Sequence, residues 1–400
     1  MDFSYSPEEE EFRQEVREWL AENMRELPEW WGRRDMAGPE IDSEEYHQFH
    51  LWWHKKLHAA GYVGIHWPKE YGGRGATLLE QVVFNEEMAK HRAPGPTNVH
   101  GLGWCGPAIL AAGTEGQKKR FLPKILSAEE MWCTLYSEPE AGSDMANVQT
   151  RAVEDGDDFV VNGQKVWTSN WRGAGHGADW AVLLARTDPD APKHRGLSYM
   201  VVNMKSPGIE FRPLRQITGH SEFAETFLDN VRIPQGNLLG QKNMGWYVAM
   251  GALEFERSGI GASITRENTI KDLIHMAKGI ERNGEPVTKD PAIRRKLAGF
   301  YIEANVLRYV GLRNLTHQLR GERPGPNLAH VLGVEFGQRL QDFALQLEGP
   351  YSRLMRGSKY AIEHGRWQQS FLSARSSSIA TGTSEIQRNV IAQRALGLPR

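Results

Sequence analysis

The sequence predicts a multidomain α+β protein in which a middle β domain separates two helical domains. Helix-capping signals recur in the first third, closely spaced strand and turn signals follow, and long helical patterns fill the last part. A chain of 400 residues is also too long for one ordinary core. We expect an N-terminal α-helical domain over residues 1–130, a middle β domain over 131–240 and a C-terminal α-helical domain over 241–400.

Residues that cap the first helical turn mark several helix starts in the N-terminal domain. Ser6 is followed by Pro7 and Glu9, which predicts a capping box with proline at the first helical position. Apolar side chains then recur at helical spacing. Further starts are predicted at Asp42 and Glu45, at Thr77 and Glu80, and at Thr114 and Gln117.

The middle domain contains short β-branched and aromatic runs divided by turn residues. Asp155-Gly156 and Asn162-Gly163 are typical of two-residue hairpin turns, and a strand is expected between them. Such close spacing predicts a small antiparallel barrel or a sandwich. Further strands are expected at residues 165–167, 181–185, 197–202 and 225–228.

Long amphipathic helices are expected in the C-terminal domain, where they would pack into a bundle within or between subunits. We expect them at about residues 245–279, 291–321, 327–359 and 384–396.

Composition excludes several classes of protein. The formal charge is −2, so nothing indicates nucleic acid as the main partner. No apolar run approaches the roughly 20 residues of a membrane span, and the acidic start is unlike a signal peptide. Cys105 and Cys133 are the only cysteines, without metal-ligand spacing. We therefore expect no metal, no membrane partner and a cytoplasmic location.

Two segments of the middle domain carry candidate chemistry. The turn over residues 136–144 contains Gly142-Ser143, which exposes backbone N–H groups and a hydroxyl to a ligand. The segment over residues 162–170 places Trp167 beside hydroxyls, which suits a flat heteroaromatic ring. Taken singly, a plain turn and a core tryptophan are the better explanations of these patterns.

Two segments of the C-terminal domain add to them. Glu254-Phe255-Glu256-Arg257 lies on the first long helix, where its charges either act on a ligand or are simply solvated. Thr383 can cap the last helix, which leaves N–H groups for an anion or a carbonyl oxygen, or only ends a helix.

Together and in this order, the segments resemble the acyl-CoA dehydrogenase family. The run from Glu138-Pro139 to Asp144 resembles the first signature of the family, and the run from Gly382 to Arg388 is similar to the second. Residues 67–73, 113–115 and 163–170 agree as well, so the resemblance covers nearly the whole chain. It implies the fold of that family, with an N-terminal helical domain, a middle β-barrel domain and a C-terminal helical bundle.

The resemblance also implies FAD as cofactor and an acyl-CoA as substrate. Ser143 and Arg257 would contact the substrate. Trp167 would cover the flavin ring and Ser169 would bond near its N5 atom, while Gln346 and Gly349 would bind the adenine half from a second subunit. The cofactor-binding positions implied by the family are Tyr136, Ser137, Gly142, Ser143, Trp167, Ser169, Gln346, Gly349, Thr383 and Glu385.

The position of the catalytic base follows from a departure. Many members have a glutamate directly before the glycine of the second signature, where this chain has Thr381. Isovaleryl-CoA and long-chain acyl-CoA dehydrogenases instead have a Glu-Arg pair on the first C-terminal helix, which Glu256-Arg257 matches. The resemblance therefore implies that Glu256 removes the α proton while FAD N5 takes the β hydride, giving a trans-2-enoyl-CoA. The N–H of Thr381 would bond the thioester oxygen.

A second departure concerns the subunits. The Arg-x-x-Phe-Gly stretch of many members is missing at residues 278–284. The family implies a homo-tetramer or dimer, or one half of a hetero-oligomer, with electron-transferring flavoprotein as acceptor and a role in fatty acid or lipid metabolism. Alternatives are an acyl-CoA oxidase, a flavin monooxygenase, or a non-catalytic partner subunit. The sequence does not name the acyl group.

Overall fold

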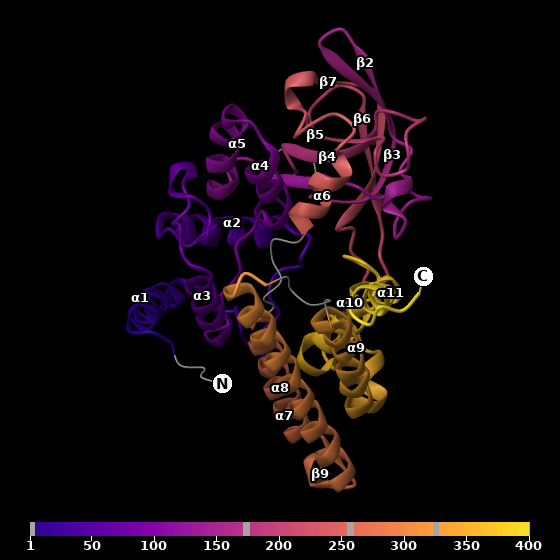
Figure 1. Cartoon of the computed structure of the whole chain (residues 1–400). Coiled ribbons are helices and arrows are strands. Elements are labelled where there is room, and N and C mark those ends of the chain that lie inside the picture. Colours follow the sequence, from indigo (N-terminus) through magenta and orange to yellow (C-terminus); the bar gives the residue numbers. More distant parts are fainter. Residues whose placement is uncertain (1–4, 171–176, 254–259, 323–327, 400) are drawn as a thin grey trace. The chain divides into compact units, whose positions relative to one another are not determined.

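The chain folds into two compact units, each assembled from segments that are separate in the sequence. The computed structural model describes residues 5–170, 177–253, 260–322 and 328–399 (Figure 1). Residues 39–76 and 95–256 form what we call the sheet unit. Residues 1–38, 77–94 and 257–400 form what we call the helical unit. The three-part division near residues 130 and 240 stays a prediction, since the two units are defined by packing.

The helices of the sheet unit begin close to the expected capping residues. Thr114 and Gln117 form the predicted capping box, in which each side chain bonds the backbone N–H of the other. The helix expected from Asp42 and Glu45 begins at Glu44, and Ser43 caps it rather than Asp42. A π-helical turn, η3 (Gly101–Cys105), leads directly into an α-helix. The α-helices are α2 (Glu44–Ala59), α4 (Gly106–Ala112), α5 (Glu115–Ser127) and α6 (Gly245–Leu253).

Seven strands form one mixed sheet in this unit (Figure 1). Hydrogen-bonded neighbours follow the order β1-β4-β2-β3-β7-β6, and β5 pairs with β4. The expected antiparallel pairing holds in part, because β4 pairs in parallel with both β1 and β2. The strands are β1 (Trp132–Leu135), β2 (Arg151–Asp155), β3 (Asp158–Ser169), β4 (Trp180–Arg186), β5 (Leu197–Asn203), β6 (Ile209–Leu214) and β7 (Phe223–Pro234).

One of the two predicted hairpin turns is confirmed and the other is wrong. The chain does turn from β2 into β3 at Gly156, which has φ 62°, although the two loop residues are Gly156 and Asp157, because Asp155 pairs with Asp158. Asn162-Gly163 instead lies inside β3, where the pairing with β7 shifts register. A Cβ atom on Gly163 would lie 2.4 Å from Oγ1 of Thr150. The glycine therefore permits a close approach of backbone at a bulge rather than a turn.

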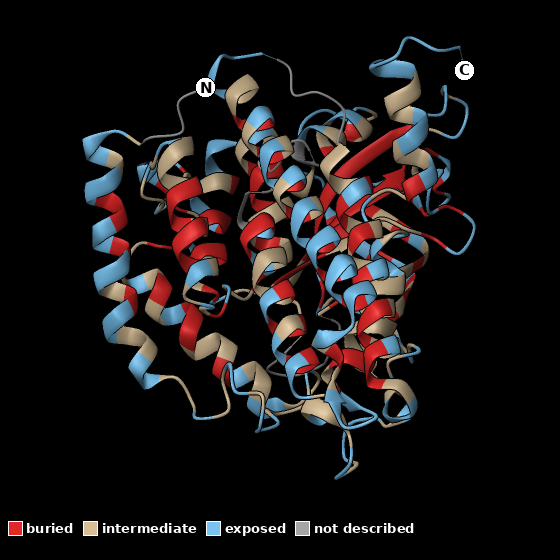
Figure 2. Ribbon diagram, turned by 90° about the horizontal axis from the view of Figure 1, so that it is seen from below, coloured by how far each residue is buried: buried red, intermediate tan, exposed pale blue. Residues whose placement is uncertain are grey.

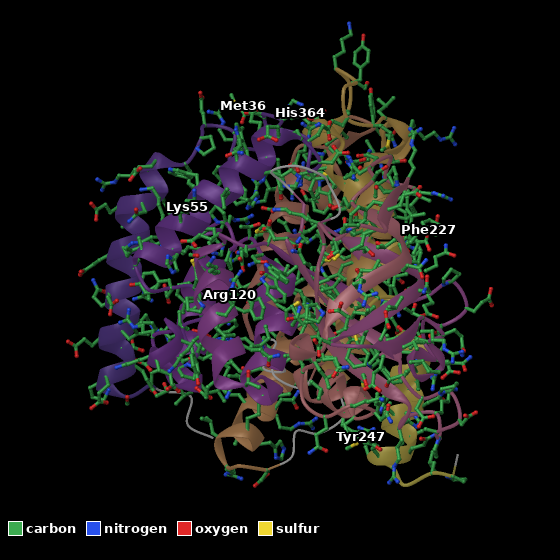
Figure 3. All side chains as sticks on the ribbon, turned by 90° about the horizontal axis from the view of Figure 1, so that it is seen from above. Met36, Lys55, Arg120, Phe227, Tyr247 and His364 are labelled. Carbon is green, nitrogen blue, oxygen red and sulfur yellow. The ribbon has the colours of Figure 1, made fainter. Side chains whose placement is uncertain are left out.

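Buried apolar side chains of the strands form a core in the sheet unit. β4 and β5 are buried along most of their length, as their continuous apolar runs require. On β7 burial alternates, so that Thr226 and Leu228 are buried while Phe227 lies on the other face (Figure 3). The guanidinium of Arg212 covers the ring of Phe227.

The helical unit consists of seven α-helices among the described residues. The capping boxes at Ser6 and Thr77 and the cap at Thr383 are confirmed. The helix expected over residues 327–359 ends at Glu348, because Gly349 has φ 60° and Pro350 follows. The helices are α1 (Pro7–Asn23), α3 (Leu78–Lys90), α7 (Ile260–Lys278), α8 (Pro291–Leu319), α9 (Leu328–Glu348), α10 (Arg366–Ser377) and α11 (Ser384–Arg394).

Two further differences concern the same part of the chain. The sequence patterns did not predict α10, which is short and rich in polar residues. The single helix expected over residues 245–279 is described as α6 and α7, and residues 254–259 lie outside the described part.

Apolar residues from α7, α8, α9 and α10 form the core of the helical unit. Figure 2 shows the resulting alternation of buried and exposed residues along the helices. Between α1 and α3, the buried Arg13 bonds Glu86 at 3.0 Å and Glu87 at 2.7 Å. The largest core residues are Phe300, Phe336, Phe343 and Trp367.

Membrane insertion and metal binding find no support in the part of the chain that the structure describes. No helix there combines the length and the apolar character needed to cross a bilayer. Nor do three or more His, Cys, Asp or Glu side chains gather there in an arrangement suited to a metal ion.

Candidate functional site

The turn over residues 136–144 follows β1 in the sheet unit. Glu138 and Ala141 close it with two backbone hydrogen bonds of 3.1 Å, and Val166 of β3 donates a bond of 2.9 Å to the carbonyl of Ser137. Gly142 and Ser143 are exposed beyond this closure, and a Cβ atom on Gly142 would meet nothing within 4 Å. The turn is therefore fixed at its base and open at its tip.

A buried ion pair lies beneath this turn. Nζ of Lys165 lies 2.8 Å from Oε1 of Glu138, and Lys165 is 0% exposed. Burial lowers the pKa of Lys165 to about 8, although Glu138 acts to raise it. Burial acts to raise the pKa of Glu138, but Lys165 and the N–H groups of Gln149 and Thr150 outweigh it, so that the pKa is lowered. The carboxylate and the ammonium thus keep each other charged in the core.

Trp167 occupies a bulge near the end of β3. One extra residue on β3 faces β7 between Lys165 and Thr168, and Trp167 has φ 64°. The left-handed region costs a bulky residue about 1–2 kcal/mol. The indole is nevertheless 56% exposed, and its only described ring partner is the edge of Phe223 at 6.1 Å. Such strain at an exposed aromatic residue indicates a surface kept for a ligand.

The hydroxyl of Ser169 lies two residues further along β3. Its Oγ is buried and makes no hydrogen bond among the described residues, whereas the neighbouring Thr168 bonds Thr226 at 2.7 Å. An unpaired buried hydroxyl costs about 1–3 kcal/mol and demands an explanation. A flat heteroaromatic ring with polar atoms at its edge would use both the Trp167 face and the Ser169 hydroxyl. The isoalloxazine of FAD is such a ring, so these residues fit the cofactor that the resemblance implies.

Tyr136 joins the turn to the interior of the sheet unit. Its hydroxyl bonds that of Tyr199 on β5. Burial raises the pKa of both phenols. An electrostatic interaction with the buried Cys105, at the end of η3, acts in the same direction on both. The β1 end of the turn, β5 and η3 therefore meet at one place.

The second signature lies in the helical unit, between α10 and α11. Thr381 has φ 56° and Gly382 has φ 95°, and the N–H of Thr381 donates no hydrogen bond among the described residues. Thr383 caps α11 by accepting a bond of 3.1 Å from the N–H of Ile386. Glu385 follows, exposed in the first turn. This backbone can offer a free N–H to a carbonyl oxygen and a helix N-terminus to an anion.

The expected adenine-binding positions lie at the C-terminal end of α9. Gln346 is exposed in the last turn and Gly349 follows in a left-handed conformation. Arg282 donates bonds of 2.7 and 3.1 Å to the carbonyls of Gln346 and Leu347. Arg282 belongs to a small hairpin of β8 (Glu281–Arg282) and β9 (Glu285–Pro286), where the Arg-x-x-Phe-Gly stretch is missing. This hairpin therefore places the guanidinium of Arg282 beside Gln346, although the Arg-x-x-Phe-Gly stretch is missing.

Glu348, between these two positions, is a buried carboxyl that the sequence patterns did not single out. Burial raises its pKa to about 7, with Gln368 acting to lower it and Glu363 to raise it. Nε2 of Gln368 bonds one carboxyl oxygen at 2.5 Å, and the other oxygen has no partner among the described residues. The carboxyl is therefore poised to hold a proton near neutral pH.

In the helical unit, the second signature and the expected adenine-binding positions lie at opposite ends of the α9–α10 pair. Gln338 bonds Ala374 and Ser378, near the end of α10, whereas Glu348 bonds Gln368, near its start. Eight residues separate Gln338 from Gln346, which is about 12 Å along a helix. In the sheet unit the structure bonds Tyr136 and Ser137 to β3, the strand that also carries Trp167 and Ser169, and in the helical unit it places Thr381, Thr383 and Glu385 in one short segment. It does not bring Gln346 and Gly349 to the latter.

The proposed base lies outside the described residues. Glu256 and Arg257 both fall within residues 254–259. The preceding α6 is described, and it packs on β5 and α4, with Tyr247 half-exposed on its surface (Figure 3).

Lys165 is the main residue of this region that sequence reasoning missed. Inward positions of β3 alternate through Phe159 and Val161, and a lysine at Lys165 continues that alternation. A charged residue on the apolar face of a predicted strand was the signal available.

Comparisons with known proteins follow the same order of segments. Family models described as the N-terminal, middle and C-terminal domains of acyl-CoA dehydrogenase match residues 6–129, 133–231 and 243–396. The chain is 39% identical over 406 residues to acyl-CoA dehydrogenase IpdE1 of Mycolicibacterium smegmatis, covering 98% of each chain.

Two solved structures are similar over the full length. The Tcur3481-Tcur3483 steroid ACAD superposes with a TM-score of 0.85 at 30% identity, covering 100% of each chain. The ChsE4-ChsE5 complex from Mycobacterium tuberculosis superposes with a TM-score of 0.82 at 30% identity, also covering 100% of each chain.

Proposed function

Because this chain belongs to the acyl-CoA dehydrogenase family and is an oxidoreductase of that family, we propose that it converts an acyl-CoA into the trans-2-enoyl-CoA. The observation that carries the proposal is the exposed, strained Trp167 beside the unpaired hydroxyl of Ser169. These are the two positions at which the family resemblance expects the flavin ring. A protein that used the fold only as a scaffold would gain nothing from either.

The chain's own residues would hold FAD in two places. In the sheet unit these are Trp167, Ser169 and the turn from Tyr136 to Ser143, and in the helical unit Thr383 and Glu385. FAD, when bound, supplies a two-electron acceptor for the hydride that leaves Cβ. Gly142 and Ser143 leave the tip of the turn open, which supports contact there with both cofactor and substrate.

We assign the removal of the α proton to Glu256. A carboxylate near its reference pKa of about 4.3 is too weak a base for an α C–H group in water. A bound acyl group would expel water and raise that pKa, which makes the carboxylate a stronger base. The free N–H of Thr381 supports the proposal, since a donor at the thioester oxygen stabilises the developing negative charge. Arg257 would then contact the substrate.

We propose that a second subunit completes the cofactor site. Gln346 lies about 12 Å along α9 from the level of Ser378, and Gly349 follows the end of α9, which supports their use by a neighbouring subunit. Two of the similar structures are complexes of two named proteins, which supports a hetero-oligomer over a homo-tetramer. Electron-transferring flavoprotein is the proposed acceptor, in a cytoplasm whose reducing character agrees with the free cysteines Cys105 and Cys133.

For the acyl group we propose a bulky, steroid-derived chain. A similar structure at 30% identity is described as a steroid ACAD. Base placement at Glu256 rather than at Thr381 also agrees with branched or polycyclic chains.

Anaerobic mixing of the purified holoenzyme with straight, branched and steroid-derived acyl-CoAs tests the function. Loss of the visible flavin absorption with a steroid-derived acyl-CoA, and release of the enoyl-CoA, is the expected result. Rapid peroxide formation in air would show an oxidase instead. A chain that binds no FAD even with its copurified subunit would show a non-catalytic partner.

A further inference from the structure

Lys165 makes more hydrogen bonds than its one ion pair requires. Its Nζ atom donates to Oε1 of Glu138 at 2.8 Å, to the carbonyl of Leu184 at 2.8 Å and to the carbonyl of Tyr136 at 3.0 Å. An ammonium has three N–H donors, so every one of them is used. Leu184 belongs to β4, whereas Tyr136 and Glu138 belong to the turn over residues 136–144. One side chain of β3 is therefore bonded both to β4 and to the turn.

Two of the three acceptors lie in the turn that is expected to contact the cofactor. Lys165 holds the carbonyl of Tyr136, and the next residue, Val166, holds the carbonyl of Ser137 through its N–H at 2.9 Å. Adjacent residues of β3 thus fix adjacent residues of the turn. On its other side Glu138 accepts bonds of 2.6 and 2.8 Å from the N–H groups of Gln149 and Thr150.

The same strand carries the other half of the site. Trp167 and Ser169 follow Lys165 by two and four residues, within about 7 and 13 Å along an extended strand. β3 therefore places the ring-facing residues directly and the turn indirectly, through Lys165. A change at Lys165 would therefore move the turn relative to Trp167 without altering any residue that is expected to contact the flavin.

We propose that Lys165, fixed by Glu138, is a positioning residue that sets the turn from Tyr136 to Ser143 against Trp167 and Ser169 for binding of the flavin. The proposal rests on the proposed function for the identity of the ligand. The rival explanation is that Lys165 only neutralises the buried charge of Glu138 and thereby stabilises the fold.

The double variant Lys165→Met with Glu138→Gln separates the two explanations. It removes both charges at similar volume, so the fold is expected to survive even if Lys165→Met alone does not. Lys205→Met is the matched control, because Lys205 also pairs with a carboxylate, Asp179 at 2.7 Å, but is 73% exposed. The measurements are the unfolding midpoint, the Kd for FAD by fluorescence, and amide hydrogen exchange over residues 136–150 without cofactor.

The double variant should bind FAD about tenfold more weakly than the wild type, since the carbonyls of Tyr136 and Leu184 lose their donor. Exchange over residues 136–150 should accelerate while β5 is unchanged, and Lys205→Met should match the wild type. A double variant with wild-type FAD affinity and wild-type exchange in the turn would overturn the proposal. If the wild type itself binds no FAD, the proposed function fails, and the exchange experiment still decides whether Lys165 sets the turn.

Discussion

Arg92 donates two parallel hydrogen bonds, each 2.9 Å long, from its two terminal nitrogens to the two carboxylate oxygens of Asp272. Asp272 is 4% exposed on α7, and it also accepts bonds from Arg34 and Arg366. Burial acts to raise the pKa of Asp272, but the three guanidinium groups lower it to about 2. One carboxylate thus joins α7 to the chain before α2, to the end of α3 and to the start of α10.

Asp272→Asn should destabilise the helical unit by about 3 kcal/mol, because it leaves guanidinium groups without their counter-charge. The measurement is the urea midpoint of the helical signal. Asp342→Asn is the control, since Asp342 pairs with Arg375 at 3.1 Å but is 42% exposed, and it should cost no more than about 0.5 kcal/mol. Equal midpoints for the two variants would show that the Asp272 cluster contributes no special stability.

The buried carboxyl of Glu348 should make the protein less stable as the pH rises. Its pKa in the folded state is raised to about 7 by burial, and in the unfolded chain it is about 4.3. Between these values the folded state binds the extra proton, so the free energy of unfolding falls with rising pH, by roughly 4 kcal/mol in all. Glu348→Gln removes this titration.

The stabilisation of Glu348→Gln over the wild type should therefore be larger at about pH 8 than at about pH 5. Urea midpoints at both pH values measure it, with Asp342→Asn on the same helix as the control. Parallel pH curves for Glu348→Gln and the wild type would mean that Glu348 is not protonated in the folded state.

The sequence predicted the helix starts better than the pairing of strands. A capping box such as that of Ser6 acts within three residues, so local spacing suffices to find it. Asn162-Gly163 has the local signature of a turn, but contact with Thr150 decides its structure. The parallel pairing of β1 with β4 leaves no local trace, because the partners are far apart in the chain.

The same distinction holds at the site. Trp167 and Ser169 lie within one segment whose order of residues is informative, and both have the environment expected of ligand contacts. Lys165 was missed because its partner Glu138 is 27 residues away, and a lone lysine normally indicates an exposed position. Arg282 was missed for the same reason, since only the fold brings it to the carbonyl of Gln346.

Ser169→Ala and Thr168→Val should separate a hydroxyl kept for a ligand from one that stabilises the strand. Thr168→Val leaves the hydroxyl of Thr226 unpaired and should cost about 1–2 kcal/mol in the cofactor-free protein. Ser169→Ala breaks no bond among the described residues, so it should cost little there but weaken FAD binding. Urea unfolding and FAD titration check both. A Ser169→Ala protein with wild-type FAD affinity would contradict the assignment.

Trp167→Gly should be more stable than Trp167→Ala, which is the reverse of the usual order in a strand. Both variants remove the indole and should weaken FAD binding. At φ 64° glycine is unstrained, so the cofactor-free glycine variant should be more stable than the alanine variant by about 1 kcal/mol. At an ordinary strand position the order is reversed. If alanine is the more stable replacement, the left-handed conformation of Trp167 is not maintained in solution.

Glu256→Gln should abolish turnover while FAD stays bound, since it keeps the shape of the side chain and removes the base. Loss of a positioned general base slows the chemical step by about 10²–10⁴-fold. The rate of anaerobic flavin reduction by a good acyl-CoA substrate measures this step directly. Glu254→Gln is the matched control, because in the helix that the sequence predicts here a residue two positions earlier faces nearly the opposite side. Reduction of Glu256→Gln at a near-native rate would place the base elsewhere, whereas equal losses in both variants would indicate a general disturbance of the protein rather than a missing base.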